Sequence, residues 1–303
     1  MDAGEYDVHL RSAAFDFLGS VSARLGGPVK YDDVASFVFQ GERIPLMPTQ
    51  QGIRKPRQLQ AALSFRTVHA ERPDQRPYDD GEGLDGYLRY KWRGTDPGQA
   101  DNVALRRASR DRRPLIWFRG IASGLYVPIF PVWLIDEEPA EHQFVVALDG
   151  EQVDGWFGGE VIDLDTRRRY AERTVLQRLH QPLFRARVLH AYANNCSVCR
   201  LRHPELLDAA HILGDADGGD PVVTNGIAMC KIHHAAFDYN ILGISADHRI
   251  SVRADVMAET DGPTLRHSLQ EMDGAQIGLP SQRAARPDRD RLAERFRRFL
   301  QAG

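Results

Sequence analysis

Cysteine, lysine and long apolar stretches are all scarce in this 303-residue chain. It has three cysteines, and only four of its 39 basic residues are lysines. No apolar run approaches the ~18 residues of a membrane-spanning helix, and the first residues lack the basic and apolar regions of a signal peptide. We therefore expect a cytoplasmic protein with no membrane partner. In that compartment, closely spaced cysteines indicate metal binding rather than disulfides.

A strong positive charge is also missing. The net charge is −3, so the overall charge does not indicate a nucleic-acid partner. Arginines nevertheless gather at residues 106–113, 167–187 and 283–298. Arginine suits phosphate contacts because its planar guanidinium donates several hydrogen bonds. In the alternative interpretation, these clusters are solvated faces of a chain that uses arginine in place of lysine throughout.

Length and composition predict a globular protein of two domains. The chain is 42% hydrophobic and 27% charged, which lies in the range of folded rather than disordered proteins. The pattern along the chain divides it into a first domain over residues 1–150, a helical linker over 151–190 and a second domain over 191–303. The predicted fold class is α+β.

The first domain alternates between helical and strand patterns. An amphipathic helix is expected over residues 8–25 and a short helix over 31–36. Short strands punctuated by Gly, Pro and Asp follow, as in a β-barrel or a strongly bent sheet. They are expected within residues 37–47, 62–70, 87–94, 114–121, 125–135 and 142–148. A basic helix over 166–194, broken or restarted at Pro182, and a terminal helix over 287–300 complete the prediction.

All three cysteines fall in one short window at metal-ligand spacing. Cys196-x2-Cys199 forms one knuckle, and Cys230-x2-His233 forms the second. Four such ligands suit a tetrahedral structural zinc ion. A hairpin with one helix is too small to bury a core, so zinc would replace the missing hydrophobic burial.

Other polar residues occur in a set order between and after these knuckles. His211 lies near the end of an apolar run of strand length at residues 206–212, and a turn-rich loop at 214–221 leads to Asn225. A helix is expected to begin near residue 229 or 230. On that helix His234 and Asp238 are four residues apart and so project from the same side.

This ordered set resembles the HNH endonuclease family, whose ββα-metal site cuts nucleic acid. The resemblance covers about residues 185–245. It implies that His211 is the general base, for which the ordinary histidine pKa of about 6.5 is suitable. It implies that His234 holds a catalytic Mg²⁺ or Mn²⁺ against the scissile phosphate, and that Asn225 braces the loop that orients His211.

One position departs from the family pattern. Many members carry Asp or His directly before the base, as a further metal ligand, but this chain has Ala210. Asp208 lies on the same strand face two residues earlier and is expected to replace that ligand, or Asp238 contributes from the helix. The alternative for the whole window is a zinc ribbon that serves only as a scaffold or a DNA-binding knuckle.

Residues 75–135 resemble an SRA domain, a PUA-like barrel that flips modified cytosine out of DNA. The matching segments are Tyr78-Asp79-Asp80-Gly81, Asp85-Gly86, Tyr90, and residues 102–105, 114–119 and 126–128. The resemblance implies a base pocket with aromatic faces from Tyr78, Tyr90 and Trp92, and a carboxylate from Asp79 or Asp80 that reads the cytosine amino group. The family's base-reading Asp is replaced by Gly81. Alternatively, these aromatic residues are ordinary barrel core.

Together the two resemblances predict a modification-dependent restriction endonuclease of the SRA-HNH, type IV kind. Its partner is double-stranded DNA that carries a modified cytosine. One active site per chain cuts one strand, so double-strand cleavage implies a homodimer. Three alternatives remain open: a nuclease that reads unmodified sequence or phosphorothioate DNA, a non-catalytic zinc-containing DNA reader, and an RNA-directed nuclease.

Overall fold

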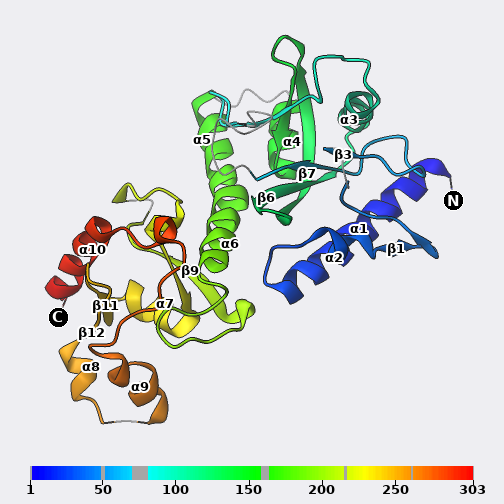
Figure 1. Ribbon diagram of the computed structural model, residues 1–303. Helices are drawn as coiled ribbons and strands as arrows, with labels where there is room; N and C mark the ends of the chain where they lie inside the picture. The colour runs from blue at the N-terminus through cyan, green and yellow to red at the C-terminus, as the bar shows by residue number, and fades with distance from the viewer. Residues whose placement is uncertain are drawn as a thin grey trace. The chain divides into compact units, whose positions relative to one another are not determined.

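The computed structural model describes residues 2–48, 52–69, 81–157, 164–214, 217–260 and 262–302. The chain forms two compact units, Met1–Leu183 and Phe184–Gly303, whose elements are labelled in Figure 1. None of the helices in these described ranges has the length and hydrophobicity needed to cross a lipid bilayer.

Within its described residues, the first unit contains a six-stranded sheet and five α-helices. The strand order is β3-β4-β6-β7-β8-β5, and only β4 and β6 run parallel among the neighbouring pairs. The strands are β3 (Ile53–Arg54), β4 (Ser64–Thr67), β5 (Leu88–Lys91), β6 (Leu115–Ala122), β7 (Leu125–Glu138) and β8 (Gln143–Ala147). The helices are α1 (Ala3–Leu25), α2 (Tyr31–Ala35), α3 (Ala100–Arg110), α4 (Gly150–Phe157) and α5 (Leu164–Val175), and a hairpin pairs β1 (Val38–Phe39) with β2 (Glu42–Arg43).

The sheet is strongly curled. Three strands separate β4 from β5 in the sheet order, yet the rings of Phe65 on β4 and Tyr90 on β5 lie 4.5 Å apart. Two register shifts on β6–β7 and one on β7–β8 bend the long strand β7. In the described part of the chain, the edge strands β3 and β5 do not pair with each other. The first unit is therefore an α+β domain with a curled sheet, and a closed SRA/PUA-like barrel stays a prediction.

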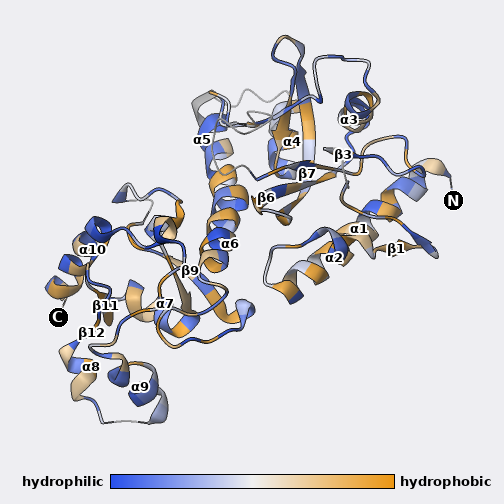
Figure 2. Ribbon diagram, viewed as in Figure 1, coloured by the Kyte–Doolittle hydropathy of each residue, from blue (hydrophilic) through white to orange (hydrophobic). Residues whose placement is uncertain are grey.

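Helix α1 begins five residues earlier than the sequence pattern predicts, because a capping box starts it. The Asp2 carboxylate accepts a hydrogen bond from the Glu5 amide, and the Glu5 carboxylate accepts one from the Asp2 amide. Apolar and polar residues both occur along α1 (Figure 2). Its buried apolar residues pack on the sheet in one core with Ile116 and Phe118; they are Leu10, Ala14, Leu18 and Val21.

A buried ion pair fastens α1 to the rest of the first unit. The guanidinium of Arg11 pairs with Asp7 one turn earlier and donates hydrogen bonds to the backbone oxygens of Pro114 (2.7 Å) and Ala62 (2.9 Å). Burial lowers the pKa of Arg11 from its ordinary value. The charge thus depends on the Asp7 carboxylate for compensation.

Replacing Asp7 with alanine is expected to lower the free energy of unfolding by about 3–5 kcal/mol, because the Arg11 charge would stay buried without its partner. Urea unfolding of the full chain measures the change. The matched control is Glu42→Ala, which breaks an ion pair with the largely exposed Arg57 and is expected to cost much less, because solvent screens both charges. Equal costs for the two variants would contradict this account of Arg11.

The helical segment after α5 passes through Pro182 without ending. A five-residue π-helical turn, Leu176–His180, connects α5 to α6 (Gln181–Ala191), and the Gln181 amide bonds to the Leu176 oxygen five residues back. Proline lacks the amide hydrogen of a regular helix and its ring clashes with the preceding turn. The wider turn accommodates both effects. The chain therefore stays helical without a break, and a new α-helix restarts at Gln181, as one of the two predicted outcomes at Pro182 requires.

The second unit begins within α6 and contains two small hairpins with helices packed on them. Its elements are β9 (Leu207–His211), β10 (Gly226–Cys230), α7 (Lys231–Asp238), β11 (Leu242–Ile244), β12 (Ile250–Val252), α8 (Ala254–Ala258), α9 (Pro263–Ser268) and α10 (Arg289–Ala302). Strand β9 pairs with β10 and β11 with β12, both antiparallel. One hydrophobic core joins α6, both hairpins, α7 and α10.

Candidate active site and metal centre

Strands β9 and β10 with α7 form a ββα arrangement. In the hairpin, His211 lies opposite Gly226 and Leu207 lies opposite Cys230. Helix α7 starts at Lys231, directly after β10, with Cys230 as its N-cap residue. Cys230 therefore lies at the end of the hairpin where α7 starts, and His211 lies at the opposite end of the same hairpin.

The four predicted zinc ligands lie together. The ligand atoms of Cys196, Cys199, Cys230 and His233 are all within 4.8 Å of one another. The Nδ1 atom of His233 lies 3.5 Å from the Cys196 sulfur and 3.1 Å from the Cys230 sulfur. Three thiols and one imidazole at this spacing are a donor set that suits tetrahedral zinc.

Neighbouring groups prepare two of these ligands for a metal ion. The Nε2 atom of His233 donates a hydrogen bond to the Ser268 oxygen over 2.7 Å, which leaves the Nδ1 lone pair directed at the sulfurs. Hydrogen bonds from the Cys199 and Cys230 side chains lower the pKa of the Cys196 thiol. The lowered pKa of Cys196 favours the zinc-binding thiolate. Burial lowers the pKa of His233, but the Cys196 and Cys230 side chains and the Ser268 oxygen outweigh it and raise that pKa to about 10, so a zinc ion would displace a proton from Nδ1.

Asn225 is fully buried and ties together the loop between the two strands. Its amide nitrogen donates to the backbone oxygens of Leu213 (2.9 Å) and Asp220 (3.0 Å), and its amide oxygen accepts from the Leu213 amide (3.0 Å). Its backbone oxygen also accepts from the Ile212 amide, next to His211. The side chain thus holds the loop immediately after the half-buried His211.

Asp208 on β9 and Asp238 on α7 lie on either side of the His234 ring. The distance from His234 Nδ1 to Asp208 Oδ2 is 3.7 Å, and that from His234 Nε2 to Asp238 Oδ2 is 3.3 Å. A neutral imidazole has one N–H group and can satisfy only one of these carboxylates. The other nitrogen of a neutral ring then faces the second carboxylate without donating a hydrogen bond to it.

Ala210 contributes to the core rather than to this charged cluster. It is fully buried and pairs with Ile227 across the hairpin. Asp208, two residues earlier, is the residue of β9 that approaches His234. The described structure therefore places a carboxylate beside His234 although the position before His211 has none.

Two cationic residues near Asp208 were not singled out from the sequence. Arg185 Nε lies 3.5 Å from Asp208 Oδ1, and Lys231 Nζ lies 3.8 Å from Asp208 Oδ2. Arg185 also donates to the Leu207 backbone oxygen over 2.7 Å. In the sequence, Arg185 stands out only as part of the basic segment 167–187, and Lys231 only as one of the few lysines. Neither feature indicates that the residue lies near Asp208, because that proximity depends on the tertiary fold.

Helix α10 braces the loop and the end of α7. Arg298 pairs with Asp217 over 2.6 Å, and Arg291 lies 3.4 Å from Asp220. Arg295 donates to the Phe237 backbone oxygen over 2.5 Å. Part of the basic segment 283–298 is thus engaged with the protein itself, which limits its use as a phosphate-binding surface.

The predicted base pocket is described only in part. Tyr90 and Trp92 are buried, and protein rings lie against both of them: Phe65 and Trp117 against Tyr90, and His142 and Phe144 against Trp92. Tyr78, Asp79 and Asp80 lie outside the described residues. The pocket therefore stays a prediction, and the two described rings occupy core positions.

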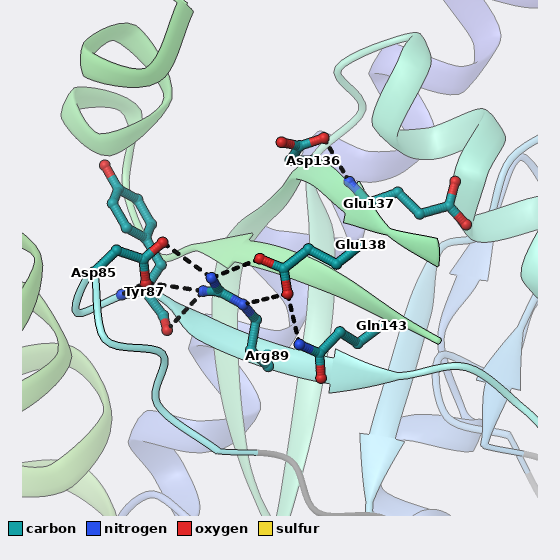
Figure 3. A network of polar contacts seen from close by, with 7 residues as sticks. All are labelled: Asp85, Tyr87, Arg89, Asp136, Glu137, Glu138 and Gln143. Carbon is teal, nitrogen blue, oxygen red and sulfur yellow. Dashed lines mark hydrogen bonds and ion pairs between the residues drawn. The ribbon is translucent and has the colours of Figure 1, made fainter. Parts of the chain in front are cut away.

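Asp85, one of the residues that match the SRA pattern, belongs to a network of polar contacts around Arg89 (Figure 3). Arg89 on β5 donates to both oxygens of Glu138 (2.8 and 3.0 Å) and to both oxygens of Asp85 (3.0 and 3.1 Å). Gln143 donates to the same Glu138 carboxylate over 2.6 Å. The network joins the 82–87 segment to the end of β7.

The Arg89 network predicts a pH dependence of stability. Hydrogen bonds from Arg89 hold the pKa of Glu138 below its ordinary value of 4.5. Because the folded pKa is the lower one, Glu138 stabilises the fold fully above about pH 4.5 and loses this effect as the pH falls through the lowered value. Urea unfolding of wild type and Glu138→Gln from pH 7 to pH 3 should show a difference that shrinks below pH 4.5. A constant difference would contradict the assignment.

The ββα arrangement of the second unit and its Cys3His cluster agree with a match found by sequence comparison. Residues 196–245 match the family model described as HNH endonuclease. This match contains the zinc cluster, the hairpin and α7. The chain thus carries an HNH endonuclease domain and is a nuclease, which makes nucleic acid its binding partner.

Two solved structures are similar to most of this chain at low identity. One is a modification-dependent TagI restriction endonuclease, with 18% identity and a TM-score of 0.32 over 81% of this chain and 84% of that chain. The other is the type IV phosphorothioation-dependent restriction endonuclease ScoMcrA, with 15% identity and a TM-score of 0.23 over 82% of this chain and 59% of that chain. These TM-scores are too low to assign either fold to this chain. No protein with a curated description matches the sequence.

Proposed function

We propose that this protein is a modification-dependent DNA endonuclease whose second unit hydrolyses phosphodiester bonds and whose first unit selects the DNA. The observation that carries the nuclease half is the placement of His234 between Asp208 and Asp238. Two carboxylates and an imidazole supply donors for Mg²⁺ or Mn²⁺. A zinc-braced hairpin and helix hold these donors in place.

A divalent cation is consistent with the distances in this cluster. The Asp208 oxygen and the His234 Nδ1 atom, 3.7 Å apart, are too far apart for a good hydrogen bond but close enough for both to bind one ion. With its N–H directed at Asp238, His234 presents an unprotonated nitrogen to the ion. When bound, the cation supplies positive charge to the scissile phosphate and the departing 3′ oxygen.

His211 is the proposed general base. Its neutral ring takes one proton from a water molecule as the water oxygen forms a bond to phosphorus. The bond from phosphorus to the 3′ oxygen breaks, and that oxygen gains a proton from solvent. The products are a 3′-hydroxyl and a 5′-phosphate. Asn225 supports this step by holding the loop that follows His211.

Lys231 is proposed to face the DNA backbone at this site, next to Arg185, whose guanidinium donates to the Pro204 and Leu207 backbone oxygens. Lys231 is exposed, and both cations lie beside Asp208. Positive groups here attract the phosphate that approaches the metal donors. A single site cuts one strand, so we further propose that two chains act together on duplex DNA.

The selection of DNA by the first unit rests on its sequence resemblance to SRA domains. We propose that it accepts a flipped, modified cytosine, with Tyr78, Tyr90 and Trp92 as aromatic faces and Asp79 or Asp80 as the polar reader. Because Tyr90 and Trp92 are buried, admission of a base would require their neighbouring rings to move. Reading of an unmodified sequence or of a phosphorothioate linkage is the alternative.

Cleavage of one duplex prepared four ways tests the proposal: unmodified, with 5-methylcytosine, with 5-hydroxymethylcytosine and with phosphorothioate linkages. Each is incubated with Mg²⁺ or Mn²⁺, and an RNA duplex of the same sequence is included. Cuts confined to a duplex with modified cytosine support both halves. Cuts confined to phosphorothioate DNA, or equal cutting of all four, would exclude the modified-cytosine pocket. Binding without any cutting would instead favour a non-catalytic reader.

A further inference from the structure

Phe184 on α6 lies flat against the His211 ring. The two ring centroids are 4.0 Å apart and the ring planes differ by only 12°. Phe184 is 2% exposed and belongs to the core of the second unit. The HNH family motif does not include this residue, and its position in the sequence gives no sign that it meets His211.

Gly226 makes room for this stack. It pairs with His211 across the hairpin, and a Cβ atom at this position would lie 2.8 Å from Phe184 Cζ and 2.4 Å from Val188 Cγ2. Any side chain here would push α6 away from the hairpin, because neither distance is compatible with normal packing. The glycine and the phenylalanine therefore act together to bring an aromatic face onto the imidazole.

We propose that Phe184 is a positioning residue for His211, an inference that rests on the proposed nuclease function. Face-to-face packing fixes the plane of the imidazole. The phenyl ring covers a face of the imidazole and not the ring edge, which carries the nitrogens that act on water. As His211 takes up a proton, its ring becomes positively charged. The negative face of the phenyl ring stabilises that charge. Phe184 itself contacts no reacting atom.

The test compares Phe184→Leu with Phe184→Tyr in a steady-state cleavage assay on the DNA duplex that the wild type cuts. Leucine keeps an apolar side chain but removes the aromatic face, whereas tyrosine keeps the face. We expect Phe184→Leu to lower kcat about tenfold, with KM within about twofold of wild type because substrate binding does not involve His211 charging. Phe184→Tyr should retain the wild-type kcat.

One further variant controls for simple destabilisation, and a second displaces Phe184 from the opposite strand. Phe299→Leu makes the same change at a buried position on α10 that packs on Gly243 rather than on His211, and it should leave kcat unchanged. Gly226→Ala should lower kcat in the same direction as Phe184→Leu. Gly226 has a φ of −127°, which alanine adopts freely, so the alanine acts only through its Cβ atom.

Proton NMR of the His211 ring gives a readout that does not require catalysis. The ring current of Phe184 should shift the His211 ring protons upfield in wild type and Phe184→Tyr, and Phe184→Leu should remove this shift. Two results would overturn the inference about Phe184: a wild-type kcat in folded Phe184→Leu, or His211 ring-proton shifts that Phe184→Leu leaves unchanged. If His211→Ala is inactive in the same assay, the general-base assignment of His211 stands in either case. Cleavage at the wild-type rate by His211→Ala would overturn the general-base assignment and this inference together.

Discussion

Alanine in place of His211 is expected to lower the rate of DNA cleavage by about 10²–10⁴-fold. The variant has no group at the end of β9 to take the proton of the attacking water. Single-turnover cleavage of a labelled duplex measures the rate, and a gel-shift assay measures DNA binding. Binding should stay near that of wild type because the metal donors Asp208 and His234 are unchanged.

The control for this prediction is His203→Ala. His203 is an exposed histidine of the same unit whose side chain lies 3.6 Å from Glu205. It should cut at the wild-type rate. If His211→Ala also cuts at the wild-type rate, His211 is not the general base and the ordered HNH set does not act as proposed.

Loss of the zinc ion is expected to unfold the second unit. Cys196 and Cys230 lie inside its hydrophobic core, and the core depends on the hairpin and α7 that these ligands connect. The binding free energy of a structural zinc ion is about 10–16 kcal/mol, which equals or exceeds the whole stability of a typical domain. Cys230→Ser, or removal of zinc with a strong chelator, should therefore abolish both the fold of this unit and cleavage.

Thermal unfolding followed by circular dichroism, together with zinc analysis, tests this expectation. Wild type should contain one zinc ion per chain and lose its high-temperature transition when the ion is removed. Ser197→Ala changes a buried neighbour that is not a ligand and should keep both the zinc ion and the transition. A chelated wild type that unfolds at the same temperature as the zinc-loaded protein would refute a structural role for this cluster.

Spacing along the chain was sufficient to predict that four candidate metal ligands lie together and that a ββα arrangement carries one pair of them. The ligands Cys196, Cys199, Cys230 and His233 occur as two local pairs, and each pair needs only a turn or one helical turn to bring its members together. The apolar run at 206–212 and the periodicity of α7 are also local signals. The elements β9 (Leu207–His211) and α7 (Lys231–Asp238) accordingly lie close to the predicted ranges.

Contacts between distant segments could not be derived in this way. The approach of Asp208 to His234 depends on how α7 packs on the hairpin, and sequence reasoning could offer it only as one of two replacements for a ligand at Ala210. The stack of Phe184 on His211 depends on the absence of a side chain at Gly226. Neither relation leaves a repeating pattern in the sequence.

In the first unit, the sequence pattern missed one helix and left the role of one motif open. Helix α3 (Ala100–Arg110) was missed because its many arginines and polar residues hide a narrow buried side formed by Asn102, Ala104, Leu105 and Ala108. Asn102, assigned to a family motif, uses its buried amide to bond the Arg93 and Asp96 backbone. A motif of this kind is compatible with both a structural and a DNA-binding role, so matching it does not decide which role applies.

Cation-dependent cleavage by zinc-loaded wild type, compared with His234→Ala, is the most direct test of the central claim. We predict strand cleavage only with added Mg²⁺ or Mn²⁺, products with 3′-hydroxyl and 5′-phosphate ends, and loss of cleavage in a folded His234→Ala that still contains one zinc ion. Equal cleavage with and without the added cation, or by His234→Ala, would contradict a catalytic site built on Asp208, His234 and Asp238.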